Sequence, residues 1–246
     1  MDRGQEIPAP CRYPWHCAAM QIVAMGGGFS AESSPALDDF VLSLAGEQRP
    51  KVCFLPTASG DADHYVVRFY KAFGHRADAS HVSLFRRERG CAGISFANHL
   101  LGQDVIYVGG GSLLSLLGAW RAHGLDAVLV EAWRRGIVLC GMSAGALCWF
   151  SEAVTAFHGP AERVDALGLL PHSACVHYDA EPGRREAYRR YVADGMAAGY
   201  GLEDGAALHF IGGELAAVVR SRDDARAFHV TAAGETPIGE TVLAAA

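Results

Sequence analysis

Features that would mark a membrane or exported protein are missing from this sequence of 246 residues. No apolar run approaches the roughly 20 residues that a membrane-spanning helix needs. The N-terminus carries Arg3 and Arg12 but no continuous apolar stretch before a small-residue cleavage site, so we expect no signal peptide. The seven cysteines form no C-x-x-C pair, and several lie inside apolar runs, which indicates reduced thiols in a cytoplasmic protein.

Signals for nucleic-acid, nucleotide and metal binding are also scarce. The formal net charge of -6 leaves no basic stripe for nucleic acid. No G-x-x-x-x-G-K-[ST] phosphate loop occurs, and Gly26–Gly28 lacks the full spacing of a dinucleotide-binding loop. Two ligand-like segments, Asp61–His64 and His75–Asp78, have simple explanations as loops. We therefore expect no cofactor, no metal, no nucleic-acid partner and no membrane partner.

The composition is that of a globular protein, with 50% of the residues apolar and 20% charged. A chain of this length can bury a full core without disulfides or metals. Residues 1–19 hold three prolines and no periodicity, so we expect a flexible N-terminal arm there. We expect a single domain over residues 20–246.

A unit of short apolar strand, small-residue turn and helix occurs four times along the chain. The expected strands are Gln21–Met25, Lys51–Leu55, Asp104–Val108 and Gly136–Cys140. The expected helices have apolar residues at helical spacing and are Ala36–Ala45, Tyr65–Phe73, Leu113–Ala122 and Leu125–Arg134. This alternation predicts an α/β fold, with three α/β/α layers around a mostly parallel central sheet. Ligands bind such sheets at the carboxyl ends of the strands, where these turns fall.

The C-terminal third is less regular. Three short strands are expected there, at Ala206–Ile211, Leu215–Arg220 and Ala227–Val230. Gly212-Gly213 between the first two indicates a hairpin turn. We therefore expect a small antiparallel edge on the sheet.

The strongest chemical signal is Gly141-Met142-Ser143-Ala144-Gly145, which matches G-x-S-x-G after an expected strand and before an expected helix at Ala146–Ser151. A sharp strand-to-helix turn strains the central residue and needs small neighbours two positions away. It exposes the Ser143 hydroxyl at a helix N-terminus, where free N–H groups favour negative charge. A purely structural turn is the alternative. Cys140 is the rival nucleophile, but it lies in the strand, three residues before the apex.

A serine nucleophile needs a general base near pH 7, and histidine is the usual one. His177 follows the apolar run Ala174–Val176 and precedes a polar, turn-like segment, so it can reach a nucleophile at a sheet edge. His172, five residues earlier, is the nearest competitor. The pattern alone does not choose between them, and a hydrogen-bonded histidine without chemistry is the alternative for either.

Four motifs run through the chain in a fixed order, and together they resemble the peptidase E (dipeptidase E, serine peptidase S51) family. They are Pro56-Thr57-Ala58-Ser59, Val108-Gly109-Gly110-Gly111, Gly141–Ala146 continuing through Cys148-Trp149-Phe150, and His177-Tyr178. The resemblance covers roughly residues 20–230. It implies an α/β/α fold akin to the class I glutamine amidotransferases, and a Ser–His–acid triad that cleaves dipeptides, typically those with N-terminal aspartate.

By position in the motifs, the resemblance makes Ser143 the nucleophile and His177 the base. The backbone N–H groups of Gly111 and Ala144 would form the oxyanion hole. Two donors aimed at the developing oxyanion are typically worth several kcal/mol of barrier.

The resemblance implies that the acid of the triad falls between the serine and the histidine, and three carboxylates there are candidates. Glu152 is the best match by position, with Glu162 and Asp165 as alternatives. Two further positions depart from the family pattern. Ser112 stands where many members have asparagine, and Val176 stands where the family often has proline.

Recognition of an acidic substrate side chain needs a cation, and the resemblance points to Arg185, with Arg184 as a weaker candidate. An arginine fork can hold a carboxylate in a bidentate pair. We take Arg185 and Ser112 as the expected substrate-binding residues. The alternative is a solvated helix face around Glu186, made of Arg184, Arg185, Arg189 and Arg190.

The resemblance thus predicts a cytoplasmic serine peptidase that hydrolyses small peptides through an acyl-enzyme, with Asp-X dipeptides as one candidate substrate. The first alternative is a non-catalytic or degenerate glutamine amidotransferase-like binding protein. The second is an esterase of the α/β-hydrolase type, whose histidine comes late in the chain, as His209 or His229 would. A homodimer is one candidate for the oligomeric state.

Overall fold

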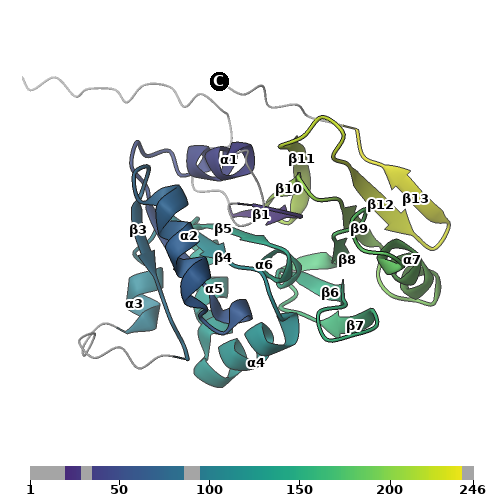
Figure 1. Cartoon of the computed structure of the whole chain (residues 1–246), viewed down its shortest axis with the longest axis horizontal. Coiled ribbons are helices and arrows are strands. Elements are labelled where there is room, and N and C mark those ends of the chain that lie inside the picture. The colour runs from purple at the N-terminus through teal and green to yellow at the C-terminus, as the bar shows by residue number, and fades with distance from the viewer. Residues whose placement is uncertain (1–19, 29–34, 86–94, 240–246) are drawn as a thin grey trace, which may run out of the picture.

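The computed structural model describes residues 20–28, 35–85 and 95–239, so the expected arm at 1–19 lies outside the described residues. A seven-stranded sheet with the order β11-β10-β1-β5-β4-β2-β3 forms its centre (Figure 1). A second, six-stranded sheet has the order β13-β12-β9-β8-β6-β7. The strands are β1 (Gln21–Met25), β2 (Lys51–Leu55), β3 (Asp78–His81), β4 (Val105–Val108), β5 (Val138–Met142), β6 (Phe150–Thr155), β7 (Glu162–Asp165), β8 (Leu170–Val176), β9 (Gly199–Leu202), β10 (Ala206–Ile211), β11 (Glu214–Arg220), β12 (Ala227–Thr231) and β13 (Gly234–Pro237).

The central sheet is parallel from β1 through β5, β4 and β2 to β3, and antiparallel where β10 joins β1 and β11 joins β10. Side chains alternate between its two faces. In β1, Val23 and Met25 belong to one apolar cluster, and Ile22 and Ala24 belong to another on the opposite face. Burial on both faces is typical of parallel sheets. The strand pairing confirms the expected mostly parallel sheet with a small antiparallel edge.

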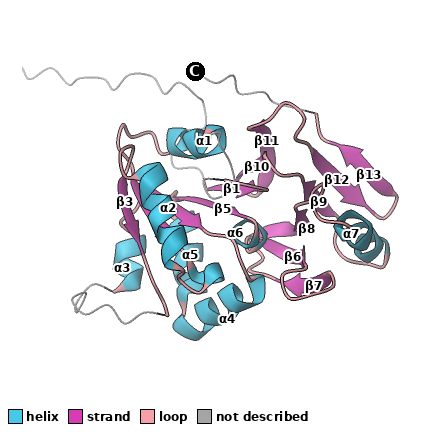
Figure 2. Ribbon diagram, in the orientation of Figure 1, coloured by secondary structure: helices cyan, strands magenta, loops and turns pink. Residues whose placement is uncertain are grey.

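Helices cover both faces of the central sheet, so the expected α/β/α layering is confirmed (Figure 2). Phe40 of α1 and Phe69 of α2 pack in the cluster that contains Val23. Trp120 of α4 and Leu129 of α5 pack in the opposite cluster. The helices are α1 (Ala36–Leu44), the 3-10 turn η1 (Thr57–Ser59), α2 (Asp63–Phe73), α3 (Phe96–Leu100), α4 (Leu113–His123), α5 (Leu125–Arg134), α6 (Ala144–Leu147) and α7 (Arg184–Ala193).

The second sheet was not predicted from the sequence. The strand expected at Ala227–Val230 is present as β12, but it belongs to this second sheet and not to the antiparallel edge of the central one. The expected helix at Ala146–Ser151 is wrong, because α6 ends at Leu147 and β6 begins at Phe150. Strand β6 pairs with both β7 and β8, so long-range pairing outweighs the local sequence preference there. Helix α7 packs Tyr188 and Val192 against this sheet, and Figure 1 shows it beside β12 and β13.

The predicted C-terminal hairpin is confirmed. Strands β10 and β11 pair antiparallel, with Ile211 opposite Glu214. Gly212 and Gly213 form the turn with φ of 60° and 94°, values that favour glycine. This hairpin extends the central sheet beyond β1.

Within the described residues, no single helix is long and apolar enough to cross a membrane. Helices α4 and α5 meet the length and composition criteria only as a pair bent by 89°. Both place residues in the core, including Trp120 and Leu129, and buried core helices meet the same criteria.

His209 of β10 is a buried histidine that titrates within an accessible pH range. Its side chain is 1% exposed, and its Nε2 atom lies 2.9 Å from Oε1 of Gln21. Burial lowers the pKa of His209 from 6.5 to about 4. As the pH falls below 6.5, the unfolded chain takes up a proton that the folded chain accepts only near pH 4, so folding stability is lost over this range.

We expect His209 to lower the free energy of unfolding by about 3 kcal/mol, as an order of magnitude, as the pH falls through that range. His209→Gln should flatten the pH dependence measured by urea unfolding at several pH values. The exposed His123 provides the control, since His123→Gln should leave the slope as in the wild type. Equal slopes in wild type and His209→Gln would contradict this account.

Candidate active site

Ser143 stands at the sharp turn between β5 and α6, as the sequence pattern predicts. Its backbone has a φ of 54° and a ψ of -119°, which is strained for a residue with a side chain. The two glycines of the motif are sterically required. A Cβ atom on Gly141 would lie 2.2 Å from the carbonyl oxygen of Gly145, and one on Gly145 would lie 2.3 Å from that of Val108. The turn therefore holds Ser143 in a nucleophile-elbow conformation.

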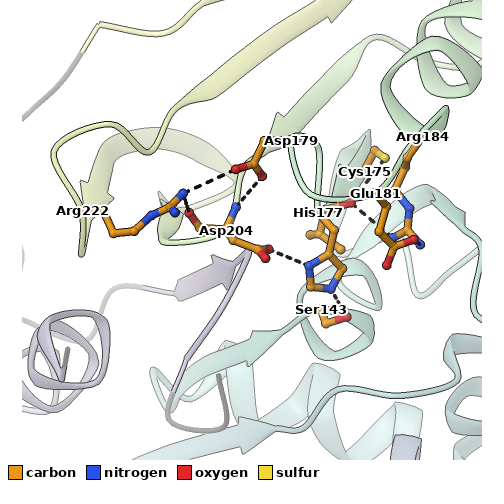
Figure 3. Close-up of polar contacts among 9 residues, drawn as sticks. Ser143, Cys175, His177, Asp179, Glu181, Arg184, Asp204 and Arg222 are labelled. Carbon is orange, nitrogen blue, oxygen red and sulfur yellow. Dashed lines mark hydrogen bonds and ion pairs between the residues drawn. The ribbon is translucent and has the colours of Figure 1, made fainter. Parts of the chain in front are cut away.

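His177 faces Ser143 from the second sheet. It follows directly after β8, and its Nε2 atom lies 2.9 Å from Oγ of Ser143 (Figure 3). Its backbone also has a positive φ, of 55°. The next residue anchors this conformation, because the Tyr178 N–H donates to the carbonyl oxygen of Leu202 at 3.0 Å. The structure thus brings together the two residues that the sequence singled out as nucleophile and base.

Asp204 is the carboxylate that contacts this histidine. Its Oδ1 atom lies 2.6 Å from Nδ1 of His177. Parallel pairing of β8 with β9 explains the contact, since Val176 pairs with Leu202 and both strands end at the same edge. The carboxylate assigns the imidazole proton to Nδ1, so Nε2 is free to accept the Ser143 hydroxyl proton.

The expected acid, Glu152, is not at this position. It pairs with Arg163, and its Oε2 atom accepts a hydrogen bond of 2.8 Å from the Ala197 N–H. In the sheet Glu152 lies beside Ser173, four residues before His177 along β8, which corresponds to roughly 13 Å of strand. The alternatives Glu162 and Asp165 lie on β7, farther from β8 than β6. None of the three therefore stands at Nδ1 of His177, where the structure places Asp204.

A signal for Asp204 was present in the sequence. The run Tyr200-Gly201-Leu202 is followed by the turn-like Glu203-Asp204-Gly205. Recognition of this run as a strand parallel to β8 would have placed Asp204 near His177, because parallel strands carry ligands at their shared carboxyl edge. The family resemblance instead places the acid between the serine and the histidine, and Asp204 comes after both.

The backbone of Gly111 and Ala144 lies in the lining of the same cleft as Ser143. Gly111 has a φ of 138°, and a Cβ atom there would lie 2.2 Å from the carbonyl oxygen of Ala58. The following Ser112 N–H donates to that same oxygen at 2.8 Å, which fixes the loop. Within the described residues, the N–H groups of Gly111 and Ala144 have no backbone acceptor. Both are therefore free to donate to a ligand.

Ser112 has a structural partner in place of the expected substrate contact. Its Oγ atom accepts the Ser115 N–H at 3.1 Å and so caps α4. The same atom lies 2.7 Å from Nε2 of His158. Ser112 is buried and is not among the residues that line the cleft.

The cleft beside Ser143 has a volume of about 330 Å³. Arg184 and Glu181 line it, together with the apolar side chains of Tyr65, Leu147 and Phe157. The side chain of Arg184 is 6% exposed, and its guanidinium forms an ion pair with Glu181 and donates to the Val176 carbonyl at 3.3 Å. Its Nε atom has no partner among the described residues.

Arg185, the expected substrate cation, is not among the residues that line this cleft. Its Nε atom donates to Oε1 of Glu235 at 2.9 Å, and its guanidinium lies 4.5 Å from the ring centroid of Phe228. Burial alone would raise the pKa of Glu235, but hydrogen bonds from Arg185 and Tyr178 outweigh burial and lower it. Arg185 thus stabilises the packing of α7 on the second sheet.

The competing residues lie away from the elbow. Cys140 is fully buried in β5, and burial, with the charge of Asp38, raises the pKa of its thiol well above the usual value. The ring of His172 packs against Tyr200, with 5.2 Å between centroids, and burial lowers its pKa. His209 is buried in the central sheet, and the exposed His229 lies on β12. Within the part of the chain that the structure describes, no group of three or more His, Cys, Asp or Glu side chains could hold a metal ion.

A serine on an α/β nucleophile elbow, hydrogen-bonded to histidine and then to a carboxylate, is the arrangement of serine-type hydrolases. The model of peptidase family S51 matches residues 22–218, and the chain belongs to this family.

Similar proteins carry the same kind of name. The chain is 45% identical over 228 residues to the "uncharacterized peptidase YgaJ" of Bacillus subtilis (strain 168), which covers 91% of this chain and 96% of that protein. It is 30% identical over 201 residues to peptidase E of Streptomyces coelicolor, covering 77% and 79%. The crystal structure of a peptidase from an acI-B1 actinobacterium superposes with a TM-score of 0.69, at 18% identity, over 90% of this chain and 94% of that one. The protein is a serine-type peptidase with the fold of these relatives.

Substitutions of Asp204 and Glu152 test which of the two carboxylates is the acid of the triad. We expect Asp204→Asn to lower kcat/KM for peptide hydrolysis by about 10³- to 10⁴-fold, because an amide favours the wrong histidine tautomer. Glu152→Gln should leave kcat/KM close to the wild-type value. It should lower Tm slightly, since a glutamine keeps an acceptor for the Ala197 N–H and loses only the ion pair with the partly exposed Arg163, which is worth about 0–1 kcal/mol. The reverse pattern, with the large loss in Glu152→Gln, would restore the acid expected from the sequence.

Proposed function

We propose that the protein hydrolyses small peptides through an acyl-enzyme on Ser143. The observation that carries the proposal is the continuous hydrogen-bonded chain from Ser143 through His177 to Asp204, which opens on a cleft. A cleft of about 330 Å³ lies at the small end of the range for ligand pockets, which supports a short substrate.

The geometry supports a stepwise mechanism. Nε2 of His177 takes the hydroxyl proton as Oγ of Ser143 attacks the substrate carbonyl. The N–H groups of Gly111 and Ala144 donate to the resulting oxyanion, and each such donor is typically worth about 3–4 kcal/mol of barrier. Asp204 stabilises the imidazolium, which returns its proton to the leaving amine as the C–N bond breaks. Water then attacks the acyl-enzyme with His177 as base, releasing the acid product and free serine.

The direct test is a panel of dipeptides, with release of the free amino acids as the readout. We expect the wild type to cleave at least one member and Ser143→Ala to lose that activity by about 10⁶-fold, with an unchanged Tm. Activity that survives in Ser143→Ala would contradict the proposed nucleophile. A folded wild type that cleaves no member would contradict the proposed substrate class.

Within this function, we propose Arg184 as the cation for an acidic residue at the N-terminal position of an Asp-X dipeptide. Arg184 lines the cleft, and Arg185 does not. At the cleft its guanidinium already pairs with the carboxylate of Glu181, and a substrate carboxylate can bind in the same way. Glu181 competes for the same guanidinium, so a substrate carboxylate must displace a side chain that is 47% exposed.

Two opposite substitutions test this specificity. Arg184→Lys should lower the ratio of kcat/KM for Asp-X over Ala-X by about tenfold, because a lysine lacks the bidentate fork. Glu181→Gln should raise the same ratio, because it removes the competing charge. Arg185→Lys is the matched control and should leave the ratio unchanged. A ratio that stays constant in both cleft variants would contradict the role of Arg184.

We also propose that the protein works in the cytoplasm. Cys53, Cys140, Cys148 and Cys175 are all free and buried, which suits a reducing compartment.

A further inference from the structure

The residue that aligns the histidine lies on a turn that crosses between the two sheets. Asp204 stands between β9 of the second sheet and β10 of the central sheet. Its side chain is 39% exposed, so packing alone does not fix its direction. A carboxylate in such a position loses rotamer freedom when it faces His177, and something must offset that cost.

Asp179 binds this turn directly. Its Oδ1 atom accepts the backbone N–H of Asp204 at 3.0 Å. Asp179 lies two residues after His177. One side chain therefore ties the loop that carries the base to the turn that carries the acid, and this link limits how far the two can separate.

Arg222 binds the same turn from the other side, as Figure 3 shows. Its Nη2 atom donates to the carbonyl oxygen of Asp204 at 2.7 Å and lies 3.4 Å from Oδ2 of Asp179. The peptide groups on both sides of the Asp204 Cα atom are thus hydrogen-bonded by side chains that also contact each other. Hydrogen bonds in which one partner is charged are stronger than those between neutral groups, so these two contacts restrain the turn more than an exposed ion pair would.

The crowding of carboxylates around this turn explains why an arginine is needed there. Burial, and then the negative charge of Asp179, raise the pKa of the neighbouring Glu203. Without Arg222, Asp179 and Asp204 would repel each other across the turn. Arg222 offsets that repulsion and still leaves the Asp204 carboxylate free to bind His177.

We propose that Asp179 and Arg222 are positioning residues, which clamp the Asp204 backbone so that its carboxylate stays on Nδ1 of His177. The inference rests on the proposed function, since it assigns the two residues a part in the same reaction. Neither residue lines the cleft, so both act through Asp204 and not on the substrate.

The test compares Asp179→Ala, Asp179→Asn, Arg222→Ala and a control. Asp224→Ala is the matched control, because Asp224 also contacts Arg222, at 3.6 Å, but does so from a side chain that is 79% exposed. Each variant is assayed for kcat and KM on the best dipeptide and for Tm. The low-field proton NMR signal of the His177 Nδ1–H group is recorded, with Asp204→Ala defining its absence.

We expect Asp179→Ala and Arg222→Ala to lower kcat by about ten- to a hundredfold, with KM within about twofold and a weakened low-field signal. Asp179→Asn keeps an acceptor for the Asp204 N–H, so most of kcat and the signal should be restored. Asp224→Ala should match the wild type.

The clamp is overturned if the two alanine variants retain wild-type kcat and the low-field signal. It is also overturned if kcat falls only with Tm while the signal persists, because the residues would then be merely structural. If the wild type cleaves no dipeptide, the proposed function fails, and the NMR signal still decides whether the clamp holds Asp204 on His177.

Discussion

The contact between Ser143 and His177 is the interaction on which the rest of the site depends, because it joins two separate sheets. The serine ends a strand of the central parallel sheet, and the histidine ends a strand of the second sheet. Their 2.9 Å contact requires the two carboxyl edges to meet within hydrogen-bonding distance. A shared apolar cluster that runs from β1 to β8 holds these edges together. Asp204, on the turn that links the sheets, then completes the alignment.

Backbone strain at the site follows from the same arrangement. Ser143 and His177 both have a positive φ, which costs of order 1–3 kcal/mol for each residue with a side chain. Each is held by a neighbouring backbone bond, from the Ser143 N–H to Met25 at 3.1 Å and from Tyr178 to Leu202. The surrounding sheets therefore supply the free energy that keeps the two side chains facing each other.

The local parts of the site could be predicted from sequence, because short-range rules govern them. The elbow follows from two glycines around Ser143, and strand β1 and helix α5 match their expected bounds. The second sheet escaped prediction because β6 and β7 carry polar residues and depend on pairing with distant strands. Arg184 and Arg185 could not be separated in advance. Adjacent helix residues point about 100° apart, and only the packing of α7 decides which one faces the cleft.

Labelling with a fluorophosphonate probe, read out by intact mass, tests the central claim most directly, because it needs no knowledge of the substrate. The account predicts one adduct per wild-type chain, none in Ser143→Ala and strongly slowed labelling in His177→Ala. A folded wild type that forms no adduct, or a Ser143→Ala variant that labels like the wild type, would contradict it.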